Sequence, residues 1–117
     1  MEAFELMKTA VKCADDKKAL EIKALNISEL TTLADYFVIC HGNSSLQMRA
    51  ISDAIEEKLK EEGVYLQNAG SQGSDQWMLM DYGDVIVHIF NAESREFYGI
   101  ENLWADAETV DISEYIS

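Results

Sequence analysis

The sequence predicts a single α/β domain in which a mixed five-stranded sheet is covered by flanking helices. Three observations lead to this fold class. The chain has 117 residues, enough for one domain with a substantial core. Apolar residues recur at helical spacing in three segments and form strand-sized runs in five others. Helices and strands that alternate along one chain are typical of helices packed on a sheet.

Two helices and three strands are expected in the first part of the chain. Apolar residues spaced three or four apart predict a helix over 2–17, and alternation predicts a half-buried strand over 20–24. The strand over 36–40 is apolar on both faces, so we expect it at the centre of the sheet. Ser44 and Gln47 have capping-box spacing, which predicts a helix that ends near Gly63. A short strand over 64–66 would complete a right-handed parallel crossover.

The remaining part of the chain predicts a hairpin followed by a short helix. The polar segment 68–76 is expected to be a loop. Apolar strands over 77–80 and 85–90 flank a turn that holds glycine and aspartates, which indicates an antiparallel pair. A helix over 93–103 follows. From about residue 105 the chain is an acidic tail that we expect to fray, within one domain spanning 1–117.

Charge is distributed unevenly along the chain. The net charge is −13, of which −2 falls on residues 1–60 and −11 on residues 61–117, where Arg95 is the only basic side chain. Because nucleic-acid affinity depends on Lys and Arg, this half is not expected to bind nucleic acid sequence-specifically. An acidic surface attracts basic proteins, although charge alone favours the simpler interpretation that it keeps the protein soluble.

Nothing in the sequence indicates a membrane segment or a secreted protein. The longest apolar run, 36–40, is far shorter than the ~20 residues that span a bilayer, and the first residues are acidic where a signal peptide would be basic. We therefore expect a cytoplasmic protein. Cys13 and Cys40 are widely spaced, so we expect two reduced, buried thiols.

Catalytic and ligand-binding patterns are weak. The segment 42–44 lies at a strand-to-helix junction that could hold a phosphate, but helix capping by Ser44 explains it better. Asp81 and Asp84 could hold the metal ions of a divergent nucleotidyltransferase, yet aspartate is also a common turn residue. His41 and His88 are expected in a core or an interface. We predict no enzymatic activity, no cofactor and no metal.

Arg95 and the large aromatic residues are the best candidates for a binding surface. Arg95 is expected to pair with a carboxylate, within the chain or on a partner. Trp and Tyr are frequent interface anchors, and Trp77 opens a strand beside a polar loop, which makes it the best candidate for exposure. Trp104 is expected to cover an edge of the core or to dock a second subunit.

Several blocks of the sequence resemble the ribosomal silencing factor (RsfS, or Iojap) family. The segment 35–44 matches the family pattern D-Y/F-F/M-V/I-I-x-x-G-x-S, and 77–88 matches W-x-L/V-x-D-x-G-D-V/I-V/I-V-H. The segments 50–53, 95–98 and 101–104 add further matches, and the resemblance covers about residues 2–112. The loop before Trp77 departs from the pattern, because the usual Glu-Gly is missing.

The resemblance implies a non-enzymatic protein that represses translation. Family members bind the large ribosomal subunit through its universal protein numbered fourteen and sterically block joining of the small subunit when nutrients are scarce. Related proteins in organelles assist large-subunit assembly, which points to ribosome biogenesis as a further role. The implied fold is nucleotidyltransferase-like without catalytic residues, and members form homodimers when free. A dimeric scaffold for another basic partner is the remaining alternative.

Taken with the acidic second half, the resemblance leads to a hypothesis for the partner-binding residues. The hairpin and the last helix would meet the basic ribosomal protein, with aromatic side chains as the apolar anchor and acids steering the approach. The predicted contacts are Trp77, Met78, Leu79, Asp81, Tyr82, Arg95 and Tyr98.

Overall fold

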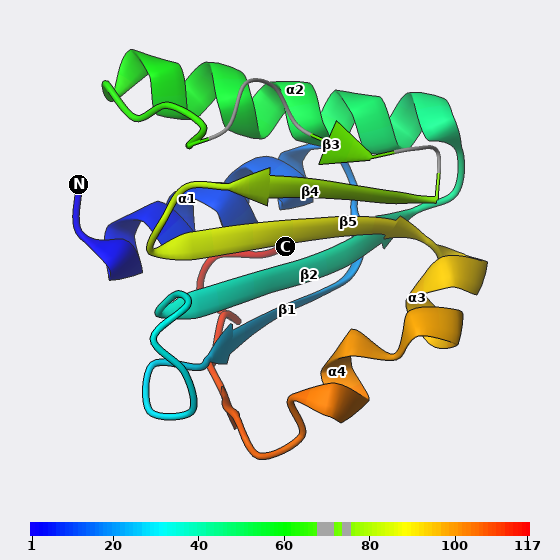
Figure 1. The fold of residues 1–117 in the computed structure, drawn as a ribbon. Coiled ribbons are helices and arrows are strands. Elements are labelled where there is room, and N and C mark those ends of the chain that lie inside the picture. Colours follow the sequence, from blue (N-terminus) through cyan, green and yellow to red (C-terminus); the bar gives the residue numbers. More distant parts are fainter. Residues whose placement is uncertain (68–71, 74–75) are drawn as a thin grey trace.

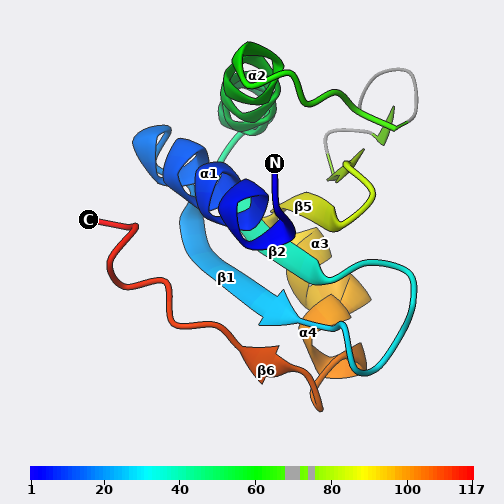
Figure 2. The same cartoon turned by 90° about the vertical axis from the view of Figure 1, so that its left-hand side faces the viewer.

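A computed structural model describes residues 1–67, 72–73 and 76–117 of the chain. Two long helices cover one face of a sheet, and two short helices lie against the other face (Figures 1 and 2). The elements in chain order are α1 (Ala3–Asp16), β1 (Leu20–Asn26), β2 (Tyr36–Gly42), α2 (Ser45–Glu61), β3 (Gln72–Gly73), β4 (Trp77–Asp81), β5 (Val85–Asn91), α3 (Ala92–Tyr98), α4 (Ile100–Leu103) and β6 (Glu108–Thr109).

The sheet is mixed, as predicted, with the order β3-β4-β5-β2-β1-β6. β2 and β5 are parallel, whereas β1–β2, β4–β5, β3–β4 and β1–β6 are antiparallel. β2 occupies the predicted central position, and β4–β5 is the predicted antiparallel hairpin. The edge strands β3 and β6 have two residues each.

The parallel crossover differs from the prediction. The segment 64–66 is not a strand: the Val64 amide bonds back to the Leu59 carbonyl at the end of α2. The parallel partner of β2 is therefore β5, which the chain reaches after α2 and β4. Part of the predicted loop 68–76 forms β3, while residues 68–71 and 74–75 lie outside the described residues.

The predicted helix over 93–103 is divided into α3 and α4 at Gly99. This glycine adopts φ +56°, a left-handed conformation that ends α3 and starts α4 in a new direction. The division matters for the site because it lets two short helices lie along the same side of the sheet (Figure 1).

The acidic tail does not fray, contrary to the prediction. β6 pairs with β1, and the Val110 amide donates to the Ala24 carbonyl at 2.8 Å. Ile112 is buried, and the ring of Tyr115 packs edge-on against Phe4 at 6.5 Å. Four apolar residues among the acids, Val110, Ile112, Tyr115 and Ile116, thus tie the tail to the core under α1 and to the sheet edge.

Two hydrophobic layers fill the domain, one on each face of the sheet. The larger layer lies between the sheet and the helices α1 and α2, and it contains Cys13 and Cys40 as free, buried thiols. The smaller layer lies on the opposite face, where Trp104 packs edge-on against Phe37 at 5.2 Å, covering a core edge. In the described part of the chain, no helix has the length and apolar character needed to cross a membrane.

Candidate interaction surface

The predicted contact residues are divided between the two faces of the sheet. Side chains alternate along a strand, so Trp77 and Leu79 of β4 join the smaller hydrophobic layer, whereas Met78 and Met80 join the larger one. Met78 therefore points toward the α1–α2 side. The sheet face that carries Trp77 is covered by α3, α4 and the turn after them, but β4 at its side remains only half-buried.

Trp77 is the centre of an aromatic cluster rather than a freely exposed side chain. Its ring stacks on Phe90 with the centroids 5.1 Å apart and lies 4.8 Å from the ring of Tyr98. Its indole Nε1–H donates to Nδ1 of His88 at 3.1 Å. The expectation that Trp77 would be well exposed is thus corrected to half-buried, because Phe90, His88 and Tyr98 enclose much of it.

Large apolar side chains project from the two short helices. Phe97 is 81% exposed, Tyr98 41% and Leu103 76%. The rings of Phe97 and Tyr98 meet edge-to-face with centroids 5.1 Å apart, which continues the cluster of Trp77 outward. We call the set formed by the half-buried Trp77, Leu79 and Asp81 of β4 and the exposed Phe97 and Tyr98 of α3 the β4–α3 surface. Large apolar side chains exposed together on a small domain mark a binding surface.

Most of the charged side chains around the β4–α3 surface are acidic, and the basic ones are the buried Arg95 and Lys23, which pairs with Glu101 of α4. Glu93, Glu96 and Asp106 are exposed on α3 and after α4. Arg95, the only basic residue of the second half, is just 8% exposed. The surface therefore combines exposed aromatic rings with uncompensated acids, a combination that suits a partner with basic side chains around an apolar patch.

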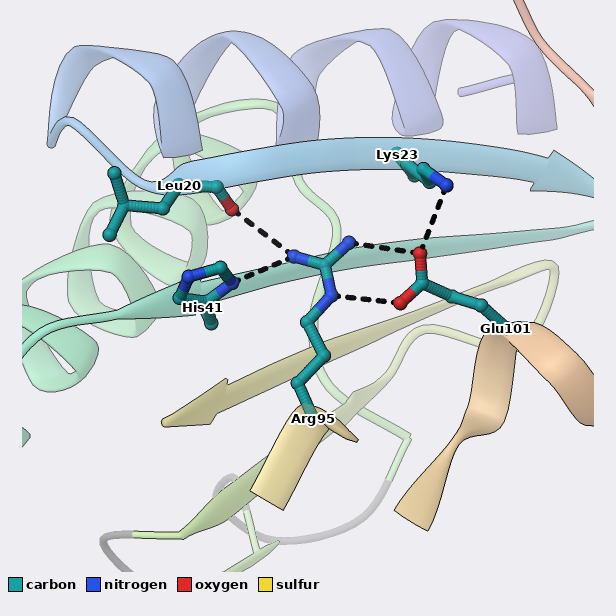
Figure 3. A network of polar contacts seen from close by, with 5 residues as sticks. All are labelled: Leu20, Lys23, His41, Arg95 and Glu101. Carbon is teal, nitrogen blue, oxygen red and sulfur yellow. Dashed lines mark hydrogen bonds and ion pairs between the residues drawn. The ribbon is translucent and has the colours of Figure 1, made fainter. Parts of the chain in front are cut away.

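Arg95 is held inside the protein by four contacts (Figure 3). Its Nε and Nη2 donate to the two carboxylate oxygens of Glu101 at 2.9 and 3.1 Å. Its Nη1 lies 2.9 Å from Nδ1 of His41 and donates to the Leu20 carbonyl at 3.3 Å. Lys23 adds an ion pair to Glu101 at 3.3 Å. Of the two pairings that the sequence left open for Arg95, the structure shows the intramolecular one.

The ionisation of this network follows from its contacts. The pKa of Glu101 is lowered, and the hydrogen bond from Arg95 is the main cause. Partial burial opposes this shift by raising the pKa, while the charge of Arg95 and the contact with Lys23 lower it further. Burial first, and then the charge of Arg95, lower the pKa of His41. The ion pair is therefore fully charged near neutral pH beside a neutral imidazole, and it fastens α3 and α4 to β1 and β2.

Tyr82 lies on the covered side of the molecule. Its side chain is 5% exposed within the layer under α1 and α2, and its hydroxyl has no hydrogen-bond partner among the described residues. Burial raises the pKa of Tyr82 well above its ordinary value. Tyr82 thus contributes to the core in the same layer as Met78 and Met80, which is the face that the alternation along β4 predicts for it.

The two weak chemical patterns have structural explanations. Oδ1 of Asp81 accepts from the Gly83 amide at 2.8 Å, and Gly83 has φ +86°, so this aspartate shapes the hairpin turn. Within the described residues, no group of three or more His, Cys, Asp or Glu side chains could hold a metal. Ser44 Oγ caps α2 by accepting from the Gln47 amide at 3.0 Å, which confirms the capping interpretation.

The exposure of Phe97 and the contact between Trp77 and His88 were both missed at the level of sequence. Phe97 and Tyr98 are adjacent in α3 and therefore lie about 100° apart around the helix. That spacing was the available signal that one of the two must face away from the core.

Comparisons with known proteins agree on one family. The family model described as "Ribosomal silencing factor during starvation" matches residues 1–117. The chain is similar to a ribosomal silencing factor RsfS from Halalkalibacterium halodurans, with 41% identity over 117 residues and 100% of both chains covered. A crystal structure from Chromobacterium violaceum matches with TM-score 0.85 and 38% identity, covering 90% of this chain and 88% of the other. One from Bacillus halodurans matches with TM-score 0.80 and 38% identity, covering 92% and 98%.

Proposed function

Because this chain belongs to the ribosomal silencing factor (RsfS, or Iojap) family, we propose that it binds the large ribosomal subunit and blocks joining of the small subunit. The family is one of silencing factors and not of enzymes, so the alternative of a divergent nucleotidyltransferase is set aside. Translation falls when large subunits carrying the protein cannot form complete ribosomes. The name of the family ties this action to starvation.

The observation that carries the proposal is the β4–α3 surface. Phe97 exposes most of its aromatic ring, and Tyr98, which packs on the half-buried Trp77, exposes part of its own. Exposed aromatic side chains clustered around a rigid centre are the usual anchors of protein interfaces. The exposed acids Glu93 and Glu96 border these rings and favour a basic protein over a phosphate backbone.

The partner that fits this surface is a basic ribosomal protein, and we propose the universal large-subunit protein numbered fourteen. Contact at the intersubunit side of the ribosome would be enough for silencing. The domain measures 34 × 33 × 30 Å, so its bulk there prevents the close approach that subunit joining requires. The same surface offers no basic group for ribosomal RNA, since Arg95 is buried.

The proposed contact set is smaller than the one predicted from sequence. Trp77, Leu79, Asp81 and Tyr98 remain in it, and the exposed ring of Phe97 is added. Met78, Tyr82 and Arg95 are left out, because they lie in the layer under α1 and α2 or in the buried ion-pair network. These three residues act on the surface only by supporting the elements that carry it.

Other expectations from the resemblance remain proposals. They are a homodimeric state of the free protein, a role in large-subunit assembly, a cytoplasmic location, and a structural relationship to nucleotidyltransferases without their catalytic residues. The exposed β4–α3 surface is compatible with a dimer that must open before the ribosome is bound, since one apolar surface can serve both contacts in turn.

Co-sedimentation with purified ribosomal subunits tests the proposed function. Wild-type protein should pellet with large subunits and not with small ones, and prior binding should reduce the fraction of complete ribosomes formed when small subunits are added. If the protein stays in the supernatant with large subunits, the proposal is wrong. If it pellets but leaves subunit joining unaffected, the silencing mechanism is wrong although the binding is real.

A further inference from the structure

His88 is a buried polar side chain in an otherwise apolar layer. It is 3% exposed and lies on β5 opposite Leu79 of β4 and Ile39 of β2. The ring of Phe37 meets it edge-on at 4.6 Å, and Phe90 lies 6.2 Å away on the same strand. An apolar residue would fill this position without desolvating any polar group, so the imidazole needs a reason beyond packing.

The hydrogen bond with Trp77 supplies that reason. An indole Nε1–H is a donor only, and here it donates to Nδ1 of His88 at 3.1 Å. Nδ1 can accept only if the imidazole is neutral and carries its proton on Nε2. Burial holds the pKa of His88 at about 4, which keeps the ring neutral near pH 7.

The same tautomer leaves Nε2–H of His88 buried and without a hydrogen-bond partner among the described residues. A buried donor without an acceptor destabilises a fold, and such groups in natural proteins are uncommon. The domain retains this unfavourable group in the residue that accepts the indole hydrogen bond. The arrangement is therefore better explained by its effect on Trp77 than by its contribution to stability.

The orientation of Trp77 decides the shape of the β4–α3 surface. β4 is a half-buried five-residue strand, so neighbouring side chains cover only part of the Trp77 ring. The indole stacks at 27° to Phe90 and supports Tyr98 from 4.8 Å, and Tyr98 in turn meets the exposed Phe97. A rotated indole would remove the support of Tyr98 and change which aromatic faces a partner meets.

We propose that His88 is a positioning residue for partner binding, which holds the Trp77 indole in the one orientation that supports Tyr98 and Phe97 on the β4–α3 surface. The inference rests on the proposed function for the identity of the partner. The positioning itself is a property of the isolated domain and can be measured without ribosomes.

Two substitutions separate the accepting nitrogen from the bulk of the ring. His88→Asn places an amide oxygen where Nδ1 lies and keeps an acceptor, whereas His88→Leu keeps an apolar filling and removes it. The indole Nε1–H resonance of Trp77, identified by its loss in Trp77→Phe, reports the hydrogen bond directly. We expect the resonance and its slow solvent exchange to persist in His88→Asn and to shift toward free indole in His88→Leu. An unchanged resonance and exchange rate in folded His88→Leu would overturn the inference.

Affinity for large subunits provides the second measurement. An anchor that must be reordered on binding loses affinity, so we expect His88→Leu to bind about three- to tenfold more weakly while His88→Asn stays within about twofold of wild type. In a Trp77→Phe background, His88→Leu should have no further effect, because the two residues act as one unit. Additive losses would mean that His88 acts by another route.

If wild-type protein binds no subunit, the proposed function and the docking role fail, and the indole resonance still decides whether His88 orients Trp77.

Discussion

Arg95 and Glu101 form a bidentate ion pair across Gly99. Nε of Arg95 lies 2.9 Å from one carboxylate oxygen of Glu101, and Nη2 lies 3.1 Å from the other. The pair joins α3 to α4 just where the left-handed glycine would otherwise let them separate. Arg95 also reaches the Leu20 carbonyl of β1, 75 residues away in the chain. The two short helices, of which α3 carries the exposed Phe97 and Tyr98, are thus fixed to the sheet by one buried guanidinium (Figure 3).

The first prediction concerns this ion pair. Arg95→Met removes the buried charge and leaves Glu101 with only the half-exposed Lys23 as an ion-pair partner, and we expect the free energy of unfolding to fall by about 2–4 kcal/mol. Lys23→Met is the matched control, because Lys23 bonds the same carboxylate but its side chain is 52% exposed. The control should cost under about 1 kcal/mol. Urea denaturation measures both variants, and equal losses would show that Arg95 is no more than a surface charge.

The second prediction concerns Phe97, the most exposed aromatic ring of the β4–α3 surface. Phe97→Ala should leave the free energy of unfolding within about 0.5 kcal/mol of wild type, since an 81% exposed ring contributes little to the core. Affinity for large subunits should fall by about 1–2 kcal/mol or more, as for interface anchors. Leu46→Ala on α2, where Leu46 is 79% exposed, is the control. Equal affinities of the two variants would place the binding surface elsewhere.

The third prediction concerns the acids beside the aromatic rings. Glu96→Lys reverses an exposed charge on α3, and we expect slower association with large subunits, by about tenfold at low salt. The difference from wild type should shrink as ionic strength rises, because salt screens exposed charges. Glu57→Lys, an exposed site on α2, makes the same change in net charge and should have a much smaller effect. Stopped-flow association rates at two salt concentrations distinguish local steering from an effect of net charge.

The fourth prediction is a loss of stability in mild acid that traces to His88. Its folded-state pKa of about 4 is lower than the ordinary value near 6.5, so the unfolded chain binds the proton first as the pH falls. Stability contributed by the neutral ring is complete above pH 6.5 and is lost progressively toward pH 4. Between pH 7 and 5 we expect the free energy of unfolding to fall by about 2 kcal/mol.

Comparison with His88→Asn isolates this contribution. Asparagine does not titrate, so the variant should show a flatter dependence of unfolding free energy on pH over the same interval. His41 remains in both proteins, and because its pKa is also lowered it contributes a slope of the same sign to each. Parallel profiles for the two proteins would mean that His88 does not titrate below its ordinary range in the folded state.

Local patterns predicted most of the elements because they depend on near neighbours. The capping oxygen of Ser44, the turn glycine Gly83 and the apolar run that forms β5 each act within a few residues. The segment 64–66 contradicts the same reasoning: it has strand-like side chains, but it is not a strand, and the Val64 amide bonds back to the Leu59 carbonyl. For the tail, the acids around Ile112 and Tyr115 predict fraying, whereas the structure packs both residues against the core.

The sequence by itself determined the family, the mixed sheet and the acidic second half, since motifs, periodicity and charge are properties of the chain. Only the tertiary structure decided which residues of the motif reach the surface. Alternation shows that Trp77 and Met78 point to opposite faces, but the placement of α1 and α2 decides which face is covered. Arg95 and His88 are likewise assigned their roles by contacts that form only in the folded chain, with Leu20 and Trp77, because burial and hydrogen bonding depend on the folded neighbourhood.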